Sequence, residues 1–278
     1  VEGVHFIKEQ IPSRSLGYKS VAVNVSDIAA MGGVPKYLFL TLAIPKETDT
    51  LWLEGLIEGI KEAADQWDIQ LLGGDTVGSK RDFFINATLI GSAKNIKFRN
   101  GAAQDDILFV TGVLGDSWGG LKALQEDFNS STAVDKLIQA HFRPSPSPAI
   151  GQWLASYPEV HSLMDISDGL DIDLRRMMTK SSLKAIVNLE ALPLSKELLT
   201  VATAYQFDPK ISALEGGEDY CLLGTIAKEA FDRINAQFLE HFGFNLFQIG
   251  SVTEGVGVLY RLNGNEFSHE TKNFDHFE

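Results

Sequence analysis

Strands and helices are interleaved along this chain, but not in the strict alternation that a doubly wound parallel sheet requires. Apolar residues recur at helical spacing over residues 16–31 and 50–67, and residues 37–44 and 83–93 have the pattern of strands. The same criteria predict further strands over residues 1–6, 69–72, 107–111, 184–189, 220–226, 246–252 and 256–262, and further helices over 115–125, 149–156, 167–177 and 227–241. We therefore expect an α+β fold.

A polar stretch over residues 94–106, with Gly101 inside it, separates the early elements from the later ones. A chain of 278 residues is long enough for two domains of ordinary size. We predict an N-terminal domain over residues 1–95 and a C-terminal α+β domain over residues 105–278.

Three acidic segments lie far apart in the sequence but have similar chemistry. Asp27 lies in a predicted helix, Asp75 follows two glycines at a predicted strand end, and Asp165 and Asp168 flank Ser167. Clusters of carboxylate and hydroxyl oxygens suit hard divalent cations such as Mg2+, which commonly binds together with nucleotide phosphates. The pattern indicates a Mg2+ and nucleotide site, although a surface aspartate, a plain turn and a capped helix would explain each segment separately.

The segment around Ser167 is the most specific of the three. Ser167 is a good helix N-cap, and the first amides of such a helix are free to face an anion. Asp165 and Asp168 lie on either side of that point. Asp171 and Asp173 are expected to be solvated rather than ligating.

The net charge of -13 argues against a protein that binds the phosphate backbone of nucleic acid. The longest apolar run, over residues 37–44, is too short to cross a membrane. The single cysteine, Cys221, excludes an intramolecular disulfide. A cytoplasmic protein is the simplest interpretation.

Two short patterns resemble catalytic motifs. Residues 73–80 nearly match a phosphate-binding P-loop, but the lysine does not follow the second glycine directly. Residues 115–119 match the nucleophile elbow of hydrolases around Ser117, with Asp208 and His276 downstream in triad order. A serine hydrolase using Ser117 is therefore kept as an alternative.

Taken together, these segments resemble the thiamine-monophosphate kinases, a family of the aminoimidazole-ribonucleotide-synthetase-like superfamily. The matching stretches follow the order of the family along nearly the whole chain: residues 1–6, 24–32, 72–76, 111–117, 165–170 and 216–220. The resemblance implies Mg2+-dependent transfer of the γ-phosphoryl group of ATP to thiamine monophosphate, giving thiamine diphosphate. It fits the selenophosphate and purine-pathway synthetases of the same superfamily less well.

The resemblance also implies roles for particular residues. Four aspartates would bind Mg2+, namely Asp27, Asp75, Asp165 and Asp168, and the last three of these are the expected catalytic residues. Contacts to ATP would come from Gly74, Asp75, Arg99 and Ser167. The thiamine moiety would be held by His5, Glu218 and Phe274.

The fold implied by the resemblance is an N-terminal α/β domain that dimerises by forming a shared barrel, followed by a C-terminal α+β domain. A homodimer is therefore expected. Members of the family have a further segment before the Val1–Phe6 motif, which these 278 residues lack. This difference suggests a truncated copy with weak activity, and a catalytically impaired nucleotide-binding remnant is a second alternative.

Overall fold

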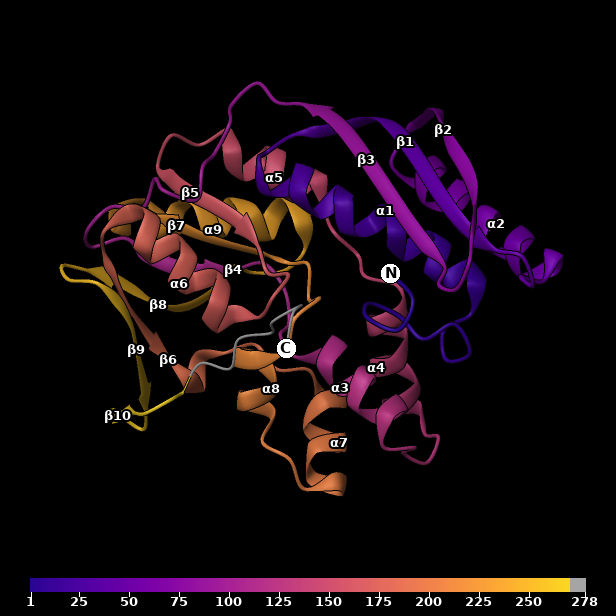
Figure 1. The fold of residues 1–278 in the computed structure, drawn as a ribbon. Coiled ribbons are helices and arrows are strands. Elements are labelled where there is room, and N and C mark those ends of the chain that lie inside the picture. The colour runs from indigo at the N-terminus through magenta and orange to yellow at the C-terminus, as the bar shows by residue number, and fades with distance from the viewer. Residues whose placement is uncertain (271–278) are drawn as a thin grey trace.

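The computed structural model of the protein describes residues 1–270, and it has the α+β architecture expected from the sequence (Figure 1). A three-stranded sheet and a seven-stranded sheet form two separate lobes. None of the helices in this part of the chain is both long and apolar enough to cross a lipid bilayer.

The smaller lobe is built from the first five regular elements: α1 (Ser13–Ala30), β1 (Val34–Pro45), α2 (Thr50–Gln66), β2 (Gln70–Ser79) and β3 (Phe84–Ser92). Strand β1 is central, parallel to β2 and antiparallel to β3. The two helices pack closely against each other at Gly17. A side chain at this position would lie 2.0 Å from the carbonyl oxygen of Leu56, so the close approach requires glycine. Both helices cover one face of the sheet, where the apolar core of this lobe lies.

The larger lobe contains the seven-stranded sheet, in the order β10-β9-β6-β8-β4-β7-β5. Its strands are β4 (Ile107–Val110), β5 (Val160–Asp165), β6 (Lys184–Asn188), β7 (Leu222–Ile226), β8 (Phe247–Thr253), β9 (Gly257–Leu262) and β10 (Asn265–Phe267). Only β6 and β9 pair in parallel. Strands β4 and β7 are buried along their whole length, so helices and other segments cover both faces of the sheet there.

The helices of the larger lobe fall into two groups (Figure 1). Those near the sheet are α5 (Pro148–Ala155), α6 (Leu170–Ser181) and α9 (Lys228–Phe242). A separate group below the sheet in Figure 1 comprises α3 (Asp116–Gln125), α4 (Thr132–Phe142), α7 (Lys196–Tyr205) and α8 (Pro209–Glu215). A short 3-10 turn covers Leu189–Ala191.

In the N-terminal part of the chain, two segments differ from their sequence predictions. Residues 1–6 form a tight turn instead of a strand, closed by a hydrogen bond from the Gly3 amide to the Phe6 carbonyl at 2.9 Å. The left-handed backbone of Gly3 makes this turn possible. In addition, β2 continues through Asp75, which the sequence placed at a strand end.

Helix α1 positions the candidate site, because it lies between the two lobes. It packs on α2 and β3 on one side and on α5 and β5 on the other. Residues of α1 can therefore contact residues of the C-terminal half of the chain directly.

Candidate active site

A buried hydrogen bond connects α1 to the end of β5. The Ser26 hydroxyl donates to Oδ2 of Asp165 at 2.7 Å, and both residues are shielded from solvent. This contact brings the acidic segment of the N-terminal lobe next to the acidic segment that follows β5. Ser26 was not among the predicted site residues, although it directly precedes Asp27 in the sequence.

Asp27 and Asp165 form an interacting pair of carboxyl groups. Asp27 keeps an exposed edge, and partial burial is the main cause that raises its pKa to about 6; the neighbouring charge of Asp165 adds to this effect, and Arg99 opposes it. Burial also raises the pKa of Asp165, while its hydrogen bond from Ser26 lowers it. The structure thus brings Asp27, Asp165 and Arg99 together, as three of the predicted assignments require. Such a pair of acids attracts a cation, because two adjacent carboxylates repel each other.

The loop between β5 and α6 differs from the capped helix predicted at Ser167. Helix α6 begins at Leu170, and its N-cap is Gly169. The amides of Ser167 and Asp168 both donate to Oδ2 of Asp173, each at 2.9 Å. These two amides already have a carboxylate as acceptor, so they are not free to hold an anion.

The expectation that Asp171 and Asp173 are solvated is wrong. Both side chains are buried, and both accept hydrogen bonds from other residues of the protein. Asp171 accepts hydrogen bonds from the Tyr260 hydroxyl at 2.5 Å and from Arg175 Nε at 2.8 Å. Asp173 also pairs with Arg176, whose Nη1 lies 3.0 Å from Oδ1 of Asp173.

Arg176 pairs with Asp168 as well, at 2.5 Å. Asp168 is exposed, and its charge raises the pKa of the neighbouring Asp165. The predicted residues Asp165, Ser167 and Asp168 therefore lie on one short loop that Asp173 and Arg176 hold in place.

Gly74 and Asp75 lie in the middle of β2, paired with Leu40 and Thr41 of β1. A side chain at position 74 would lie 1.6 Å from the carbonyl oxygen of Leu40, so only glycine fits this close approach. Asp75 is exposed, and its Oδ1 accepts from the Thr76 amide at 2.8 Å. None of the contacts that the structure gives for Asp75 is with Asp27, Asp165 or Asp168, so the structure does not join it to that group.

A cavity of about 550 Å3 opens beside the acidic loop. Two of the predicted thiamine-binding residues, His5 and Glu218, line it together with Ser167 and Asp168. Its wall is otherwise mostly apolar, with Phe6, Ile7, Ile11, Trp118, Leu121 and Phe142 among the lining residues. The third predicted thiamine-binding residue, Phe274, lies outside the described residues.

This cavity is also lined by two residues that the sequence analysis missed, Lys19 and His141. Lys19 Nζ donates to Oε2 of Glu218 at 2.8 Å, and His141 Nδ1 lies 3.2 Å from the same oxygen. Lys19 could have been found by the signal that identified Asp27, namely a charged residue on a largely apolar helix. His141 had no comparable signal, because α4 was not predicted.

The hydrolase alternative is not supported by the geometry around Ser117. In a catalytic triad, one ring nitrogen of the histidine faces the serine and the other faces the acid. Here a single nitrogen, Nδ1 of His141, lies 3.0 Å from the Ser117 hydroxyl and 3.2 Å from Glu218. Asp208 instead caps α8, accepting from the Lys210 amide at 2.8 Å, and His276 lies outside the described residues.

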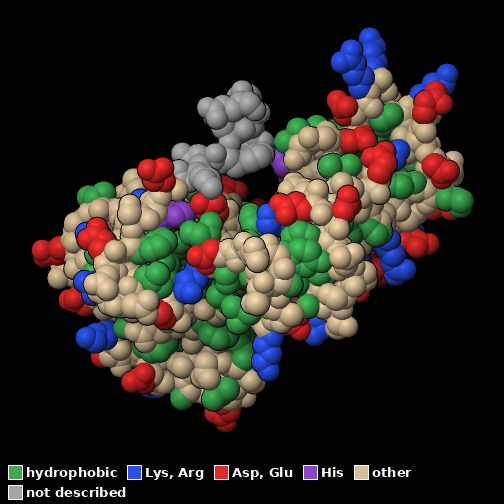
Figure 2. All heavy atoms as spheres, turned by 90° about the horizontal axis from the view of Figure 1, so that it is seen from below, with side chains coloured by type: hydrophobic (Ala, Val, Ile, Leu, Met, Phe, Trp, Pro, Cys, Tyr) green, Lys and Arg blue, Asp and Glu red, His purple; other side chains and the backbone are tan. Residues whose placement is uncertain are grey.

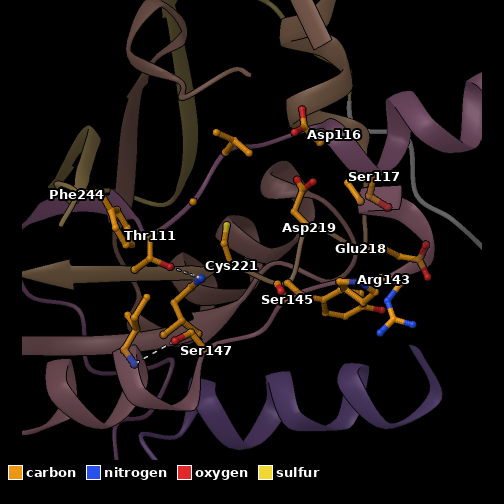
Figure 3. A pocket seen from close by; sticks show the side chains of 17 residues that line it. Thr111, Asp116, Ser117, Arg143, Ser145, Ser147, Glu218, Asp219, Cys221 and Phe244 are labelled. Atoms are coloured by element: carbon orange, nitrogen blue, oxygen red, sulfur yellow. Dashed lines mark hydrogen bonds between the residues drawn. The ribbon is translucent and has the colours of Figure 1, made fainter. Parts of the chain in front are cut away.

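The residue after Glu218 anchors the loop before β7. Both carboxylate oxygens of Asp219 lie 3.0 Å from the Gly115 amide at the start of α3, and burial raises the pKa of Asp219 well above its usual range. In Figure 3, which shows a second cavity of about 330 Å3, Asp219 points toward Asp116 and Ser117. Glu218 leaves the chain in a different direction.

Among residues 1–270, no three or more His, Cys, Asp and Glu side chains lie close enough together to hold a metal ion by themselves. The pair Asp27 and Asp165 still suits Mg2+, which proteins commonly bind through one or two carboxylates while substrate phosphates and water supply the other ligands. The donor set therefore fits a cation that arrives with a nucleotide.

Comparisons with known proteins agree with this chemistry. A family model described as the N-terminal domain of AIR synthase related proteins matches residues 1–93. The chain is 35% identical to the thiamine-monophosphate kinase of Aquifex aeolicus over 99% of its own length and 85% of that protein. It is 33% identical to the thiamine-monophosphate kinase of Bacillus subtilis, of which it covers 86%.

The chain belongs to the thiamine-monophosphate kinase family. The fold agrees as well, since a crystal structure of the Aquifex aeolicus thiamine-monophosphate kinase matches with a TM-score of 0.86 at 33% identity, covering 96% of this chain and 86% of that one. A structure described as AaThiL complexed with AMPPCP and TMP has the same TM-score and covers 97% of this chain and 82% of that one. The hydrogenase maturation protein HypE of E. coli, 21% identical with a TM-score of 0.79, shares the fold.

Proposed function

We propose that this chain transfers the γ-phosphoryl group of ATP to thiamine monophosphate, giving thiamine diphosphate and ADP. The observation that carries the proposal is the full-length similarity to thiamine-monophosphate kinases, combined with an acidic loop whose Ser167 and Asp168 line the same cavity as His5 and Glu218. The solved relative described as a complex with AMPPCP and TMP supports the same two kinds of substrate.

The residues of this site suit a reaction that needs alignment and charge neutralisation. The acceptor is a phosphate with a second pKa of about 6, so it is largely dianionic at neutral pH and needs no general base. Arg99 would form charge-assisted hydrogen bonds to ATP phosphate oxygens, and Gly74, Asp75 and the Ser167 hydroxyl would make further contacts to ATP. Positioning and electrostatic stabilisation account for most catalysis of phosphoryl transfer.

Mg2+ is the cation that we propose for the acidic group, held by Asp27, Asp165 and Asp168, with Asp75 as a further ligand. When bound, Mg2+ would neutralise charge on the phosphate oxygens. The Ser26 hydroxyl holds Asp165 toward α1, and Arg176 of α6 pairs with Asp168. Both contacts fix carboxylates that would otherwise repel each other.

The thiamine moiety would occupy the cavity of about 550 Å3. Its thiazolium ring is cationic, so the carboxylate of Glu218 is a suitable partner, and the apolar wall suits the flat surfaces of its two rings. His5 and Phe274 would complete this part of the site. Phe274 could stack on the cationic ring.

A homodimer with a shared barrel is the quaternary structure that we propose. The outer face of the three-stranded sheet is apolar and exposed at Tyr37, Phe39, Phe84 and Ile90, and every residue of β2 is at least partly exposed. An uncovered strand edge next to an apolar face is a suitable surface for pairing with a second copy. The domain limits of 1–95 and 105–278 are proposed on the same basis, since β1–β3 and β4–β10 form separate sheets.

The overall charge favours small substrates over nucleic acid. Acidic and basic side chains are interspersed on the face drawn in Figure 2, and the net charge of the chain is -13. We therefore propose ATP and thiamine monophosphate as partners, with no nucleic-acid role.

The proposed reaction is tested by incubating the chain with ATP and thiamine monophosphate, with Mg2+ or with EDTA, and measuring thiamine diphosphate. Wild type with Mg2+ should form product, EDTA should abolish it, and Asp165→Asn should lower kcat/KM by about 100-fold or more. Asp232→Asn, an exposed aspartate on α9, is the matched control and should behave as wild type. ATP binding without product formation would contradict the proposal and favour a nucleotide-binding remnant.

A further inference from the structure

Lys19 is a buried lysine whose charge has one partner among the ion pairs of residues 1–270. The residue is 7% exposed and lies on α1, in the N-terminal half of the chain. Its Nζ donates to Oε2 of Glu218 at 2.8 Å, across the interface between the lobes. A buried ammonium group is costly unless it is paired and hydrogen-bonded, so Lys19 and Glu218 constrain each other.

The same Glu218 oxygen lies 3.2 Å from Nδ1 of His141. Burial and the neighbouring charge of Lys19 lower the pKa of His141 to about 4, so its ring is neutral near pH 7. Lys19 therefore supplies the positive charge beside Glu218, whereas His141 and its partner Ser117 add only hydrogen bonding.

The backbone around Glu218 is fixed independently of Lys19. Glu218 has a left-handed backbone with φ of 64°, which is uncommon for a residue other than glycine. Its amide donates to the Ser167 carbonyl at 2.8 Å, and Asp219 is anchored to the start of α3. In Figure 3 the two acidic side chains diverge, with Asp219 directed toward Asp116 and Glu218 pointing in a different direction. The backbone thus presents Glu218, and its side-chain contacts decide where the carboxylate lies.

We infer that Lys19 is a positioning residue for the substrate: it holds the Glu218 carboxylate in a fixed orientation on the wall of the 550 Å3 cavity, where that carboxylate pairs with a cationic heterocycle. This inference rests on the proposed function, because the thiazolium ring of thiamine monophosphate is the cationic group concerned. Lys19 lines the same cavity, but its action on the ring passes through Glu218.

The test compares Lys19→Met with wild type by calorimetry of thiamine monophosphate binding and by steady-state kinetics. Loss of a charge-assisted contact should raise the Kd and KM for thiamine monophosphate about tenfold, with the KM for ATP changed less than about twofold. Lys19→Arg keeps the charge and should restore binding to within about threefold of wild type. Lys19→Gln removes the charge but keeps a donor, so it provides the same comparison if the Met variant does not fold.

A double-mutant cycle with Glu218→Gln decides whether Lys19 acts through Glu218. On the Glu218→Gln background, Lys19→Met should change the Kd for thiamine monophosphate by less than about twofold. The control is Lys136→Met, which removes a different lysine–glutamate pair, with Glu197, between α4 and α7. It should leave the Kd unchanged.

Two results would overturn the inference. One is a lower melting temperature for Lys19→Met with an unchanged Kd, which would make the pair purely structural. The other is an equal penalty for Lys19→Met with and without the Glu218 carboxylate. Wild-type protein that neither binds nor phosphorylates thiamine monophosphate would instead overturn the proposed function.

Discussion

The hydroxyl of Ser26 donates a hydrogen bond to Asp165 across 139 positions of sequence, at 2.7 Å and out of contact with solvent. Ser26 belongs to α1 and Asp165 ends β5, so this one bond joins the two lobes at the point where the acidic residues meet. Because the bond favours the ionised carboxylate, it lowers the pKa of Asp165 against the larger effect of burial. A neutral hydroxyl thus helps to keep a buried carboxylate charged.

We expect Ser26→Ala to impair both stability and catalysis. The substitution leaves a buried carboxylate without its donor, which should cost about 1–3 kcal/mol of unfolding free energy. It should also lower kcat/KM about tenfold, because Asp165 loses its fixed orientation. Ser20→Ala on the same helix is the control, since the Ser20 hydroxyl donates only to the Gly17 carbonyl. Chemical denaturation and steady-state kinetics measure the two effects, and a variant equal to Ser20→Ala in both would contradict the expectation.

The contribution of Asp27 to the stability of the metal-free protein should fall as pH rises from about 4 to above 6. The folded state raises the pKa of Asp27 from 3.8 to about 6, so between these values the folded protein holds a proton that the unfolded chain releases. More protons bound in the folded state means that unfolding free energy decreases with rising pH. This loss is complete about one pH unit above 6.

Asp27→Asn removes this contribution, so at pH 8 in EDTA the variant should melt roughly 1–3 °C above wild type. Catalysis should nevertheless be lost, since a proposed metal ligand is gone. Thermal melts at pH 4.5 and pH 8 provide the measurement, and added Mg2+ should stabilise wild type more than the variant. An Asp27→Asn protein that melts below wild type at pH 8 would show that the ionised Asp27 carboxylate does not destabilise the folded state.

Asp173 should matter for the shape of the metal-binding loop more than for its charge. It accepts the amides of Ser167 and Asp168, and burial raises its pKa to about 6. Asp173→Asn keeps an acceptor oxygen and should retain activity to within about fivefold. Asp173→Ala leaves two amides without an acceptor and should lose about 2 kcal/mol of stability and at least tenfold in kcat/KM. Equal defects in the two variants would mean that the charge toward Arg176 dominates instead.

The local pattern of the sequence predicted the two helices and the strands β1 and β3 of the N-terminal lobe closely. Helix α2 was expected over residues 50–67 and covers Thr50–Gln66, because its apolar residues keep helical spacing and Asp49 caps it. Of the four acids predicted to converge, Asp27 and Asp168 each interact with Asp165, whereas Asp75 does not join them, and their role as metal ligands stays a prediction. The three interacting acids are close in space because α1 packs against β5. No local sequence pattern predicts that packing, and the expectation that the acids converge came from the resemblance to a known family.

The misses have physical causes that lie outside any short window of sequence. Gly73 and Gly74 have the composition of a turn, but both lie inside β2. At Gly74 the Leu40 carbonyl of the neighbouring strand comes so close that it leaves no room for a side chain. Asp171 has the composition of a solvated helix residue, but Tyr260 reaches it from 89 positions away. Helix α4 was missed, and with it His141, whose partners Ser117 and Glu218 come from two other elements.

The outer face of the three-stranded sheet should be the surface that joins two copies of the chain. Tyr37 and Ile90 lie opposite each other on β1 and β3 and are 39% and 48% exposed, so a charge placed there would be buried in a shared barrel. Ile90→Asp should therefore convert a dimer to a monomer, with the dimer Kd raised by about 100-fold or more. Val256→Asp is the control, because Val256 is also an exposed apolar residue, at 73%, but lies between β8 and β9 of the other lobe. Light scattering coupled to size-exclusion chromatography measures the mass, and an Ile90→Asp protein that remains dimeric would place the interface elsewhere.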